Sequence, residues 1–453
     1  MNTTTRTTRP ALSLVGIAVA AALLAPATSR AQGSTEAAPV PVTSALQDTS
    51  LIRGPDFTRA ALEVVGANLL VWSFDRFIRE GGENPVFRVG FNSWQENLEA
   101  GWTWDDNSFS TNQFSHPYHG SLYFNAARSN GYDFWSSVPF AFAGSFTWEY
   151  FGEVHNPAMN DWIATSIGGS ALGEIFHRLG TTIRDNTATG SSRNWHEIGG
   201  LLVDPMGGVN RIIDGDWNRQ YANPEDRFPD NYRSHLEFGL RTRGEEKIWT
   251  ADTTDVYVAA EFDYGDPFYG DLGKPYDSFD FALQLNFGDK TKIGRLTGTG
   301  NLGGTFLKDT DRTKHIVAAF HRYEYINTNA LEFGGQAITA GLLSCWTYDN
   351  GFEIRTDLQA GPMILGGATS DYANISARSY DYGPGSTVVL KAELRRGAWT
   401  WLEADIAHVW LHSISGTAAD HHLVATTLRA AIPVRYNIGL GAEFTVVNAE
   451  RHY

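Results

Sequence analysis

Residues 277–287 read DSFDFALQLNF, and apolar and polar side chains alternate along this stretch. A β-strand has a side-chain period of two, so such alternation gives one apolar face and one polar face. The apolar row consists of Phe279, Phe281, Leu283, Leu285 and Phe287. Two architectures commonly contain many strands of this kind: a closed membrane barrel with a polar lumen, and a β-sandwich whose polar face meets water.

The same alternation continues to the end of the chain. It predicts eleven strands, at 232–243, 254–264, 277–287, 291–301, 312–326, 330–343, 352–361, 386–396, 399–412, 421–431 and 434–447. Because single-chain bacterial barrels usually close with an even number of strands, the long connection 362–385 is expected to hold a twelfth strand around 372–381. We therefore expect an antiparallel outer-membrane-type β-barrel of about 12 strands at 232–453, with the apolar row facing lipid.

Charged residues of both signs fall on the opposite, lumenal face of these strands. In a barrel of about 12 strands they are typical of a wet or ion-paired lumen, and a passive channel is one possible function. The set is Arg241, Arg243, Glu261, Asp263, Asp280, Glu353, Arg355, Asp357, Lys391, Glu393 and Arg395.

The N-terminus has the pattern of an export signal. Arg6 and Arg9 precede an apolar run at 11–25, and small residues at Ser29 and Ala31 predict cleavage after Ala31. Residues 1–31 are then a signal peptide, and removing their three arginines and no acidic residue takes the formal charge from -16 to -19. So acidic a chain argues against a nucleic-acid partner, whose phosphates it would repel.

Residues 32–54, rich in Ala, Pro, Ser and Thr, predict a flexible leader. From 55 to 205 the chain carries residues that commonly begin and end helices. We expect helices near 56–79, 93–100, 116–130, 138–154, 157–179 and 194–203. Residues 206–231 are expected to be a linker to the barrel. The predicted fold class is therefore α+β, with an N-terminal helical domain followed by the C-terminal barrel.

The predicted helical domain contains three closely spaced motifs. They are Asn112-Gln113 with His116-Pro117 and Gly120, Gly144-Ser145 with Trp148-Glu149, and Asn156-Pro157-Ala158 with Asn160-Asp161. In these motifs the chain resembles a bacterial envelope family of uncharacterised function, domain of unknown function 3943, over roughly residues 85–215. The resemblance implies an envelope location and brings no activity or catalytic residue with it.

Pairs of titratable residues in this domain have helical spacing. His116 and His119 are three apart, Glu149 and Glu153 four apart, and Glu174 and His177 three apart, so each pair can face one way. Facing helices with glutamates and a Glu-x-x-His motif can hold metal ions. The candidate ligands are His116, His119, Glu149, Glu174 and His177. Only one Glu-x-x-His motif is present. The alternative is a structural role, in which these residues hydrogen-bond one another. In either case we expect His116, Glu149 and Glu174 to share one cluster, with His119, Glu153 and His177 at its edge.

A second hypothesis is that the same part of the chain is the active site of a hydrolase or acyltransferase. Ser145 or Ser115 would be the nucleophile, His116 or His119 the base, and Glu149 the orienting carboxylate. The G-x-S-x-G elbow is missing, and Ser145 can instead be a small residue at a helix crossing. Candidate binding residues are Asn112, Gln113, Glu153, Asn160, Asp161 and Arg178, with helix capping or cross-linking as the alternative role.

The sequence as a whole predicts an outer-membrane protein with a periplasm-facing helical domain and outer-membrane lipid as its partner. Its expected role is envelope maintenance or binding. A lipid-modifying hydrolase or acyltransferase acting at the membrane is the first alternative, and a passive channel is the second.

Overall fold

The computed structural model describes residues 54–79, 85–224, 227–229, 231–244, 253–288, 291–328, 331–372, 378–435 and 437–453, and of residues 6–21 it describes the backbone alone. The chain divides into two compact units. The helical unit is built from residues 25–103 and 117–228, and the sheet unit from residues 1–24, 104–116 and 229–453. The predicted leader 32–54 and the cleavage site after Ala31 fall, except for Gly54, outside the described residues.

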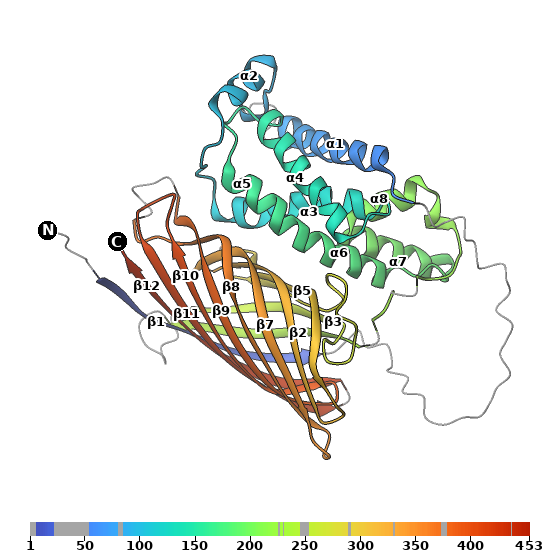
Figure 1. Ribbon diagram of the computed structural model, residues 1–453, viewed down its shortest axis with the longest axis vertical. Coiled ribbons are helices and arrows are strands. Elements are labelled where there is room, and N and C mark those ends of the chain that lie inside the picture. The colour runs from blue at the N-terminus through green and yellow to red at the C-terminus, as the bar shows by residue number, and fades with distance from the viewer. Residues whose placement is uncertain are drawn as a thin grey trace. The chain divides into compact units, whose positions relative to one another are not determined.

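The helical unit follows the predicted order of helices closely (Figure 1). Aspartates begin several of them, as where the Asp56 side chain accepts a hydrogen bond from Arg59 N at 2.9 Å and that of Asp133 accepts one from Ser136 N at 2.8 Å. None of the helices among the described residues is long and apolar enough to cross a membrane. The helices are α1 (Phe57–Phe74), α2 (Phe91–Ala100), α3 (His116–Arg128), α4 (Phe134–Phe151), α5 (Met159–Ile163), α6 (Gly169–Ile183), α7 (Gly190–Val203) and α8 (Pro205–Ile213).

All of helix α8 except Pro205 lies inside the range 206–231, which was predicted to be a linker. Pro205 occupies its first turn, and the Asp204 side chain accepts a hydrogen bond from Gly207 N at 3.0 Å. Helix α8 also packs against α7, so residues 205–213 are part of the helical unit.

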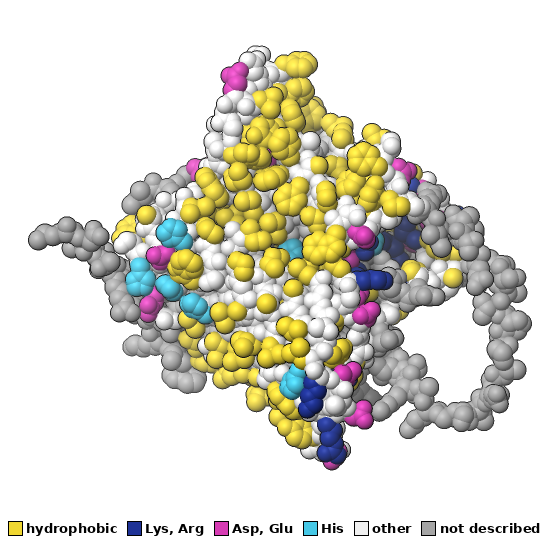
Figure 2. Space-filling model, viewed as in Figure 1, with side chains coloured by type: hydrophobic (Ala, Val, Ile, Leu, Met, Phe, Trp, Pro, Cys, Tyr) yellow, Lys and Arg dark blue, Asp and Glu magenta, His cyan; other side chains and the backbone are white. Residues whose placement is uncertain are grey.

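Polarity in the helical unit is distributed unusually, with polar groups inside and large apolar side chains outside. Helix α1 turns Arg59 and Glu63 inward, where Arg59 pairs with Glu63 at 2.9 Å and with Asp214 at 2.8 Å. Its outer face exposes Leu62, Leu69, Leu70 and Phe74, with 66%, 56%, 70% and 49% of their surface accessible. Apolar side chains accordingly cover much of the helical face seen in Figure 2. Exposed apolar area of this extent marks an interaction surface.

The sheet unit contains an antiparallel, barrel-like sheet of eleven strands in which each strand pairs with its neighbour in sequence (Figure 1). The strands are β2 (Tyr232–Gly244), β3 (Thr253–Tyr264), β4 (Phe279–Phe287), β5 (Ile293–Asp309), β6 (Thr313–Asn327), β7 (Glu332–Thr347), β8 (Phe352–Thr369), β9 (Tyr380–Arg396), β10 (Trp399–His412), β11 (Asp420–Arg435) and β12 (Ile438–His452). All eleven were predicted. The backbone of Arg6–Ala21 forms β1, which pairs with β12 on one side and β2 on the other.

The prediction of a separate twelfth strand at 372–381 is wrong. Strand β8 continues to Thr369 and β9 begins at Tyr380, and these extensions pair with each other, as in Thr369 with Tyr380. The predicted long connection is therefore mostly strand. Residues 373–377 of the predicted strand lie outside the described part of the chain.

Charged side chains line a cavity of about 200 Å³ inside the sheet unit. Arg429 pairs with Glu261 at 2.8 Å and with Glu443 at 2.7 Å, and Lys391 pairs with Glu393 at 2.9 Å. The cavity lining includes seven of the residues predicted for the lumenal face: Glu261, Asp263, Asp280, Asp357, Lys391, Glu393 and Arg395. The polar row of the alternation thus faces the interior, as expected from a period of two.

Candidate metal centre

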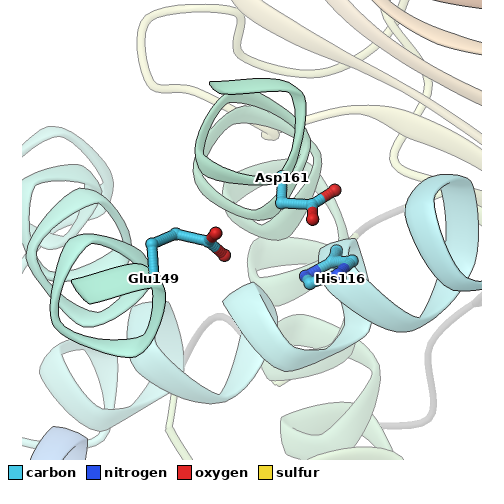
Figure 3. A group of neighbouring side chains, drawn as sticks. All are labelled: His116, Glu149 and Asp161. Atoms are coloured by element: carbon cyan, nitrogen blue, oxygen red, sulfur yellow. The ribbon is translucent and has the colours of Figure 1, made fainter. Parts of the chain in front are cut away.

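Three ligand-type side chains converge near the start of α3 (Figure 3). One ligand atom each of His116, Glu149 and Asp161 lies within 4.8 Å of the other two. His116 is the first residue of α3, Glu149 lies near the end of α4, and Asp161 lies in α5. Glu149 and Asp161 are 0% and 1% exposed, whereas His116 as a whole residue is partly exposed.

Backbone contacts between small residues bring these helices together. A Cβ added at Gly120 of α3 would lie 1.8 Å from the carbonyl oxygen of Thr165, and one added at Gly169 would lie 2.5 Å from the Gly120 backbone. A Cβ at Gly144 of α4 would meet the Tyr123 ring at 2.4 Å. Only glycine permits such close approach, so these three glycines determine how closely α3 packs against its neighbours.

The loop between α4 and α5 and the first turn of α5 hold the two carboxylates in place. Ala158 N donates a hydrogen bond to Glu149 Oε2 at 2.9 Å, and Asn160 Nδ2 donates one to Asp161 Oδ1 at 2.7 Å. Thr103 fixes the loop from the other side, because Thr103 N donates to Pro157 O and Met159 N donates to Thr103 O, both at 2.8 Å. The Asn156-Pro157-Ala158 motif is therefore a scaffold for the carboxylates.

The imidazole of His116 is held in its neutral form. Burial lowers its pKa from the ordinary 6.5 to about 4, and the opposing effect of Asp105 does not reverse this. A neutral imidazole is the form that binds metal ions. One nitrogen and two carboxylate oxygens are a donor set suited to Mn²⁺, Fe²⁺ or Zn²⁺.

Glu174 and His177 are not part of this group. Glu174 is 0% exposed and pairs with Arg128 at 2.6 Å and with Arg178 at 2.8 Å. Burial alone would raise the pKa of Glu174, but these two guanidinium groups outweigh it and lower the pKa to about 2. His177 Nδ1 lies 3.8 Å from Asp204 Oδ2. Glu174 therefore does not lie beside His116 and Glu149 as expected. It is held instead between Arg128 and Arg178, and we call these two ion pairs the Glu174 clamp.

The nucleophile and base predicted for a hydrolase or acyltransferase do not lie together in the structure. His119 Nε2 hydrogen-bonds the Tyr123 hydroxyl at 2.8 Å, and its ring packs against Trp148. Ser145 is 1% exposed, and its Oγ finds no hydrogen-bond partner among the described residues. Ser115 is exposed. The described part of the chain therefore lacks the hydrogen bond between nucleophile and base that this chemistry uses.

Two of the candidate binding residues, Glu153 and Arg178, make contacts within the helical unit that join its parts. Glu153 follows the end of α4, and its carbonyl accepts a hydrogen bond from Asn97 Nδ2 at 3.0 Å. Arg178 is one arm of the Glu174 clamp. Asn160 orients Asp161, as described above.

Asn112 and Gln113 belong to a segment, Trp104–His116, that packs against the sheet; we call it the docked segment. Asn112 Nδ2 donates to Asp105 Oδ1 at 2.7 Å and to the Tyr380 hydroxyl at 3.0 Å, and the Tyr323 hydroxyl donates to Gln113 O at 2.5 Å. Both residues are 0% exposed.

Aromatic and cationic contacts anchor the docked segment further. Phe109 stacks on Tyr325 with ring centres 5.5 Å apart and meets Tyr380 edge-on at 5.3 Å. Arg378 donates to Asp105 O at 2.9 Å. The sequence did not reveal these partners, because each lies more than 200 residues away in the chain.

Comparison with known proteins agrees with the resemblance seen in the sequence. Residues 101–206 match the family model described as Domain of unknown function (DUF3943), a shorter range than the expected 85–215. The matched range contains Glu149, Asp161 and the whole docked segment, including His116. No curated protein and no solved structure matches the chain.

Proposed function

We propose that this protein is an outer-membrane β-barrel protein with a periplasm-facing helical domain, and that His116, Glu149 and Asp161, from helices α3, α4 and α5, bind one divalent transition-metal ion. The observation that carries the proposal is the convergence of one imidazole and two carboxylates from three helices, with ligand atoms within 4.8 Å of one another. The role that follows is metal-dependent binding or maintenance in the cell envelope.

The charge of the two carboxylates supports a cation at this point. Neighbouring buried carboxylates repel each other, and burying a charge is costly unless it is compensated. The hydrogen bonds from Ala158 N and Asn160 Nδ2 orient the carboxylate oxygens. A divalent ion between them would offset their mutual repulsion, and three protein ligands would leave coordination positions for water, as in catalytic metal sites.

The test measures metal content in the full chain purified without a histidine tag. We expect the wild type to retain about one equivalent of Mn²⁺, Fe²⁺ or Zn²⁺ more than His116→Gln and Glu149→Gln do, measured by inductively coupled plasma mass spectrometry. The matched controls are His119→Gln and Glu153→Gln, which change the same residue types nearby. Equal metal content in all five proteins, or none in the wild type after dialysis against these ions, would refute the site.

The membrane part of the proposal rests on the two faces of the sheet. The interior is lined by ion-paired charges, while Leu240, Leu358, Ile406 and Leu428 are among the apolar side chains exposed on the strands, at 55%, 46%, 46% and 49%. A polar interior with an apolar outer band is typical of outer-membrane barrels. Recovery of the mature protein in the membrane fraction, with heat-modifiable migration on a gel, is the expected result. Recovery in the soluble periplasmic fraction would contradict it.

A lipid-modifying hydrolase or acyltransferase is the second candidate, and the apolar exterior of the helical unit favours it over other enzymes. Side chains such as Leu70, Trp195 and Leu202, at 70%, 71% and 76% exposure, would contact acyl chains of outer-membrane lipid. Release of fatty acid from phospholipid vesicles by the metal-loaded protein, lost in Glu149→Gln, would establish this activity. A passive channel receives less support, because ion pairs such as Arg429 with Glu261 cross the interior.

A further inference from the structure

A second group of histidines lies on the sheet, far in sequence from the helical site. His408, His422, His452 and Glu450, which we call the rim histidine patch, come from β10, β11 and β12. Strand pairing sets His422 directly opposite Glu450, and His408 lies diagonally across from His422, since its own partner is Val424. Side chains in directly opposite and diagonal positions are within reach of one another.

The distances within the patch are those of a chelating pair. His422 Nδ1 lies 3.5 Å from His408 Nε2. Two nitrogens bound to one tetrahedral zinc ion at 2.0–2.1 Å lie about 3.4 Å apart, so this pair matches the separation that an ion requires. The ring of His452 lies 5.7 Å from that of His422, and His452 Nε2 lies 3.9 Å from Glu450 Oε2.

The patch faces away from the interior cavity. Along β10, Glu403 and Asp405 line that cavity, whereas Leu402 and Ile406, which share the alternate row with His408, are 51% and 46% exposed. The patch surrounds its own hollow of about 310 Å³, lined also by Val424 and Asn448. Figure 2 shows histidine side chains gathered with acidic ones on this surface. The patch is therefore open to ions from solvent.

Its position along the strands is close to their ends. His422 lies two residues after the start of β11 at Asp420, and Glu450 lies two residues before the end of β12 at His452. In a membrane barrel this level corresponds to the headgroup region, where polar ligands keep access to water.

We propose that the rim histidine patch is a binding site for a late first-row divalent ion, Zn²⁺, Cu²⁺ or Ni²⁺, chelated by His408 and His422 with His452 as a third ligand. Imidazole nitrogen is the preferred donor for these ions, and paired strands hold the first two ligands at a fixed spacing. Rotation of the partly exposed His452 side chain brings in the third. The site stands independently of the ion at His116.

The experiment uses tag-free full chain with Glu149→Gln as background, so that the helical site does not contribute. We expect isothermal titration with Zn²⁺ to give one equivalent of binding, weakened at least tenfold by His408→Gln or His422→Gln and less by His452→Gln. With Cu²⁺, electron paramagnetic resonance is expected to show coupling to two or more imidazole nitrogens.

The control is His412→Gln, on the same row of β10, whose ring pairs with Asp420 at 2.9 Å. It should leave Zn²⁺ affinity unchanged. The proposal is overturned if the His408→Gln/His422→Gln double variant binds Zn²⁺ as tightly as the background, or if His412→Gln weakens binding as much as His422→Gln does. Retained heat-modifiable migration in each variant shows that the barrel has folded.

Discussion

At the scale of single residues, Glu174 gives a prediction about acid stability. Its pKa is lowered from 4.5 to about 2, so its ion pairs with Arg128 and Arg178 stabilise the fold fully above pH 4.5. That stabilisation, about 3 kcal/mol, is lost as the pH falls through the window from 4.5 to 2. Glu174→Gln should therefore lower the unfolding free energy strongly at pH 6 and much less at pH 2.5.

Urea titration followed by helical circular dichroism measures this difference. Comparing the wild type with the variant at each pH removes the contribution of His116, which titrates in both proteins. A loss of stability in Glu174→Gln that is the same at both pH values would show that the carboxylate is not clamped as described.

The sequence distinguished some of these residues and not others. His116 and Glu149 were predicted in one cluster and the structure brings them together, with Asp161 as the third member. Glu174 resembles Glu149 in sequence, since both lie in helices among apolar residues. What separates them is Arg128, which lies 46 residues from Glu174 in the chain and reaches it only through folding. Residue types and spacing along one helix do not contain that information.

At the scale of helices, the crossing of α3 with α6 gives a second prediction. Gly120→Ala would place a methyl group 1.8 Å from Thr165 O, which the backbone can relieve only by moving the helices apart. We expect a loss of about 3 kcal/mol or more, together with loss of the ion proposed to bind at His116, because His116 lies on the first turn of α3. Thermal unfolding and metal content report both effects.

Gly66 in α1 provides the control for that substitution. A Cβ at this exposed helical position meets nothing within 4 Å, so Gly66→Ala should stabilise the protein by about 0.5–1 kcal/mol through helix propensity. Similar effects of the two alanine substitutions would contradict the close helix crossing.

At the scale of strands, β8 allows a test of membrane depth. Leu358 and Ile354 are both exposed on this strand, at 46% and 37%, with Leu358 nearer its middle. In a bilayer, Leu358→Arg should cost about 2–4 kcal/mol and Ile354→Arg about 0–1 kcal/mol. Unfolding titrations in lipid vesicles measure the two costs. Equal and small costs at both positions would indicate a strand that faces water.

Element boundaries were predictable except where glycines fill strands. Residues 362–385 were predicted to be a connection, yet β8 extends to Thr369 and β9 begins at Tyr380, and both extensions contain glycines. A Cβ at Gly361 would lie 2.1 Å from Ile338 O, and one at Gly383 would lie 1.6 Å from His412 O. These glycines allow neighbouring strands to approach closely, and a single sequence does not separate that role from a turn.

At the scale of the whole molecule, the N-terminus decides how the sheet closes. In the structure β1 pairs with β12 and with β2. Residues 11–25, however, lack the alternation of polar and apolar residues that the remaining strands have, and they form the core of the predicted export signal. We therefore predict that the mature chain begins at Gln32. The remaining edge strands, β2 and β12, are first and last of eleven antiparallel strands, so they run in the same direction and would close the barrel as a parallel pair.

N-terminal sequencing and intact mass of protein from the membrane fraction test this directly. A mature chain that retains residues 6–21 would instead favour a twelve-strand barrel closed by β1. A cysteine pair placed across facing positions of β2 and β12 would cross-link only in the eleven-strand form.

The docked segment also imposes an order of events on a chain that is synthesised from its N-terminus. Asn112 and Gln113 leave the ribosome long before Tyr323 and Tyr380, their partners 210 and 268 residues further along. Closing so long a loop is slow and carries an entropic cost, so Phe109 lacks its aromatic partners until β6 and β9 exist. The segment can therefore dock fully only after the chain has been made as far as Tyr380.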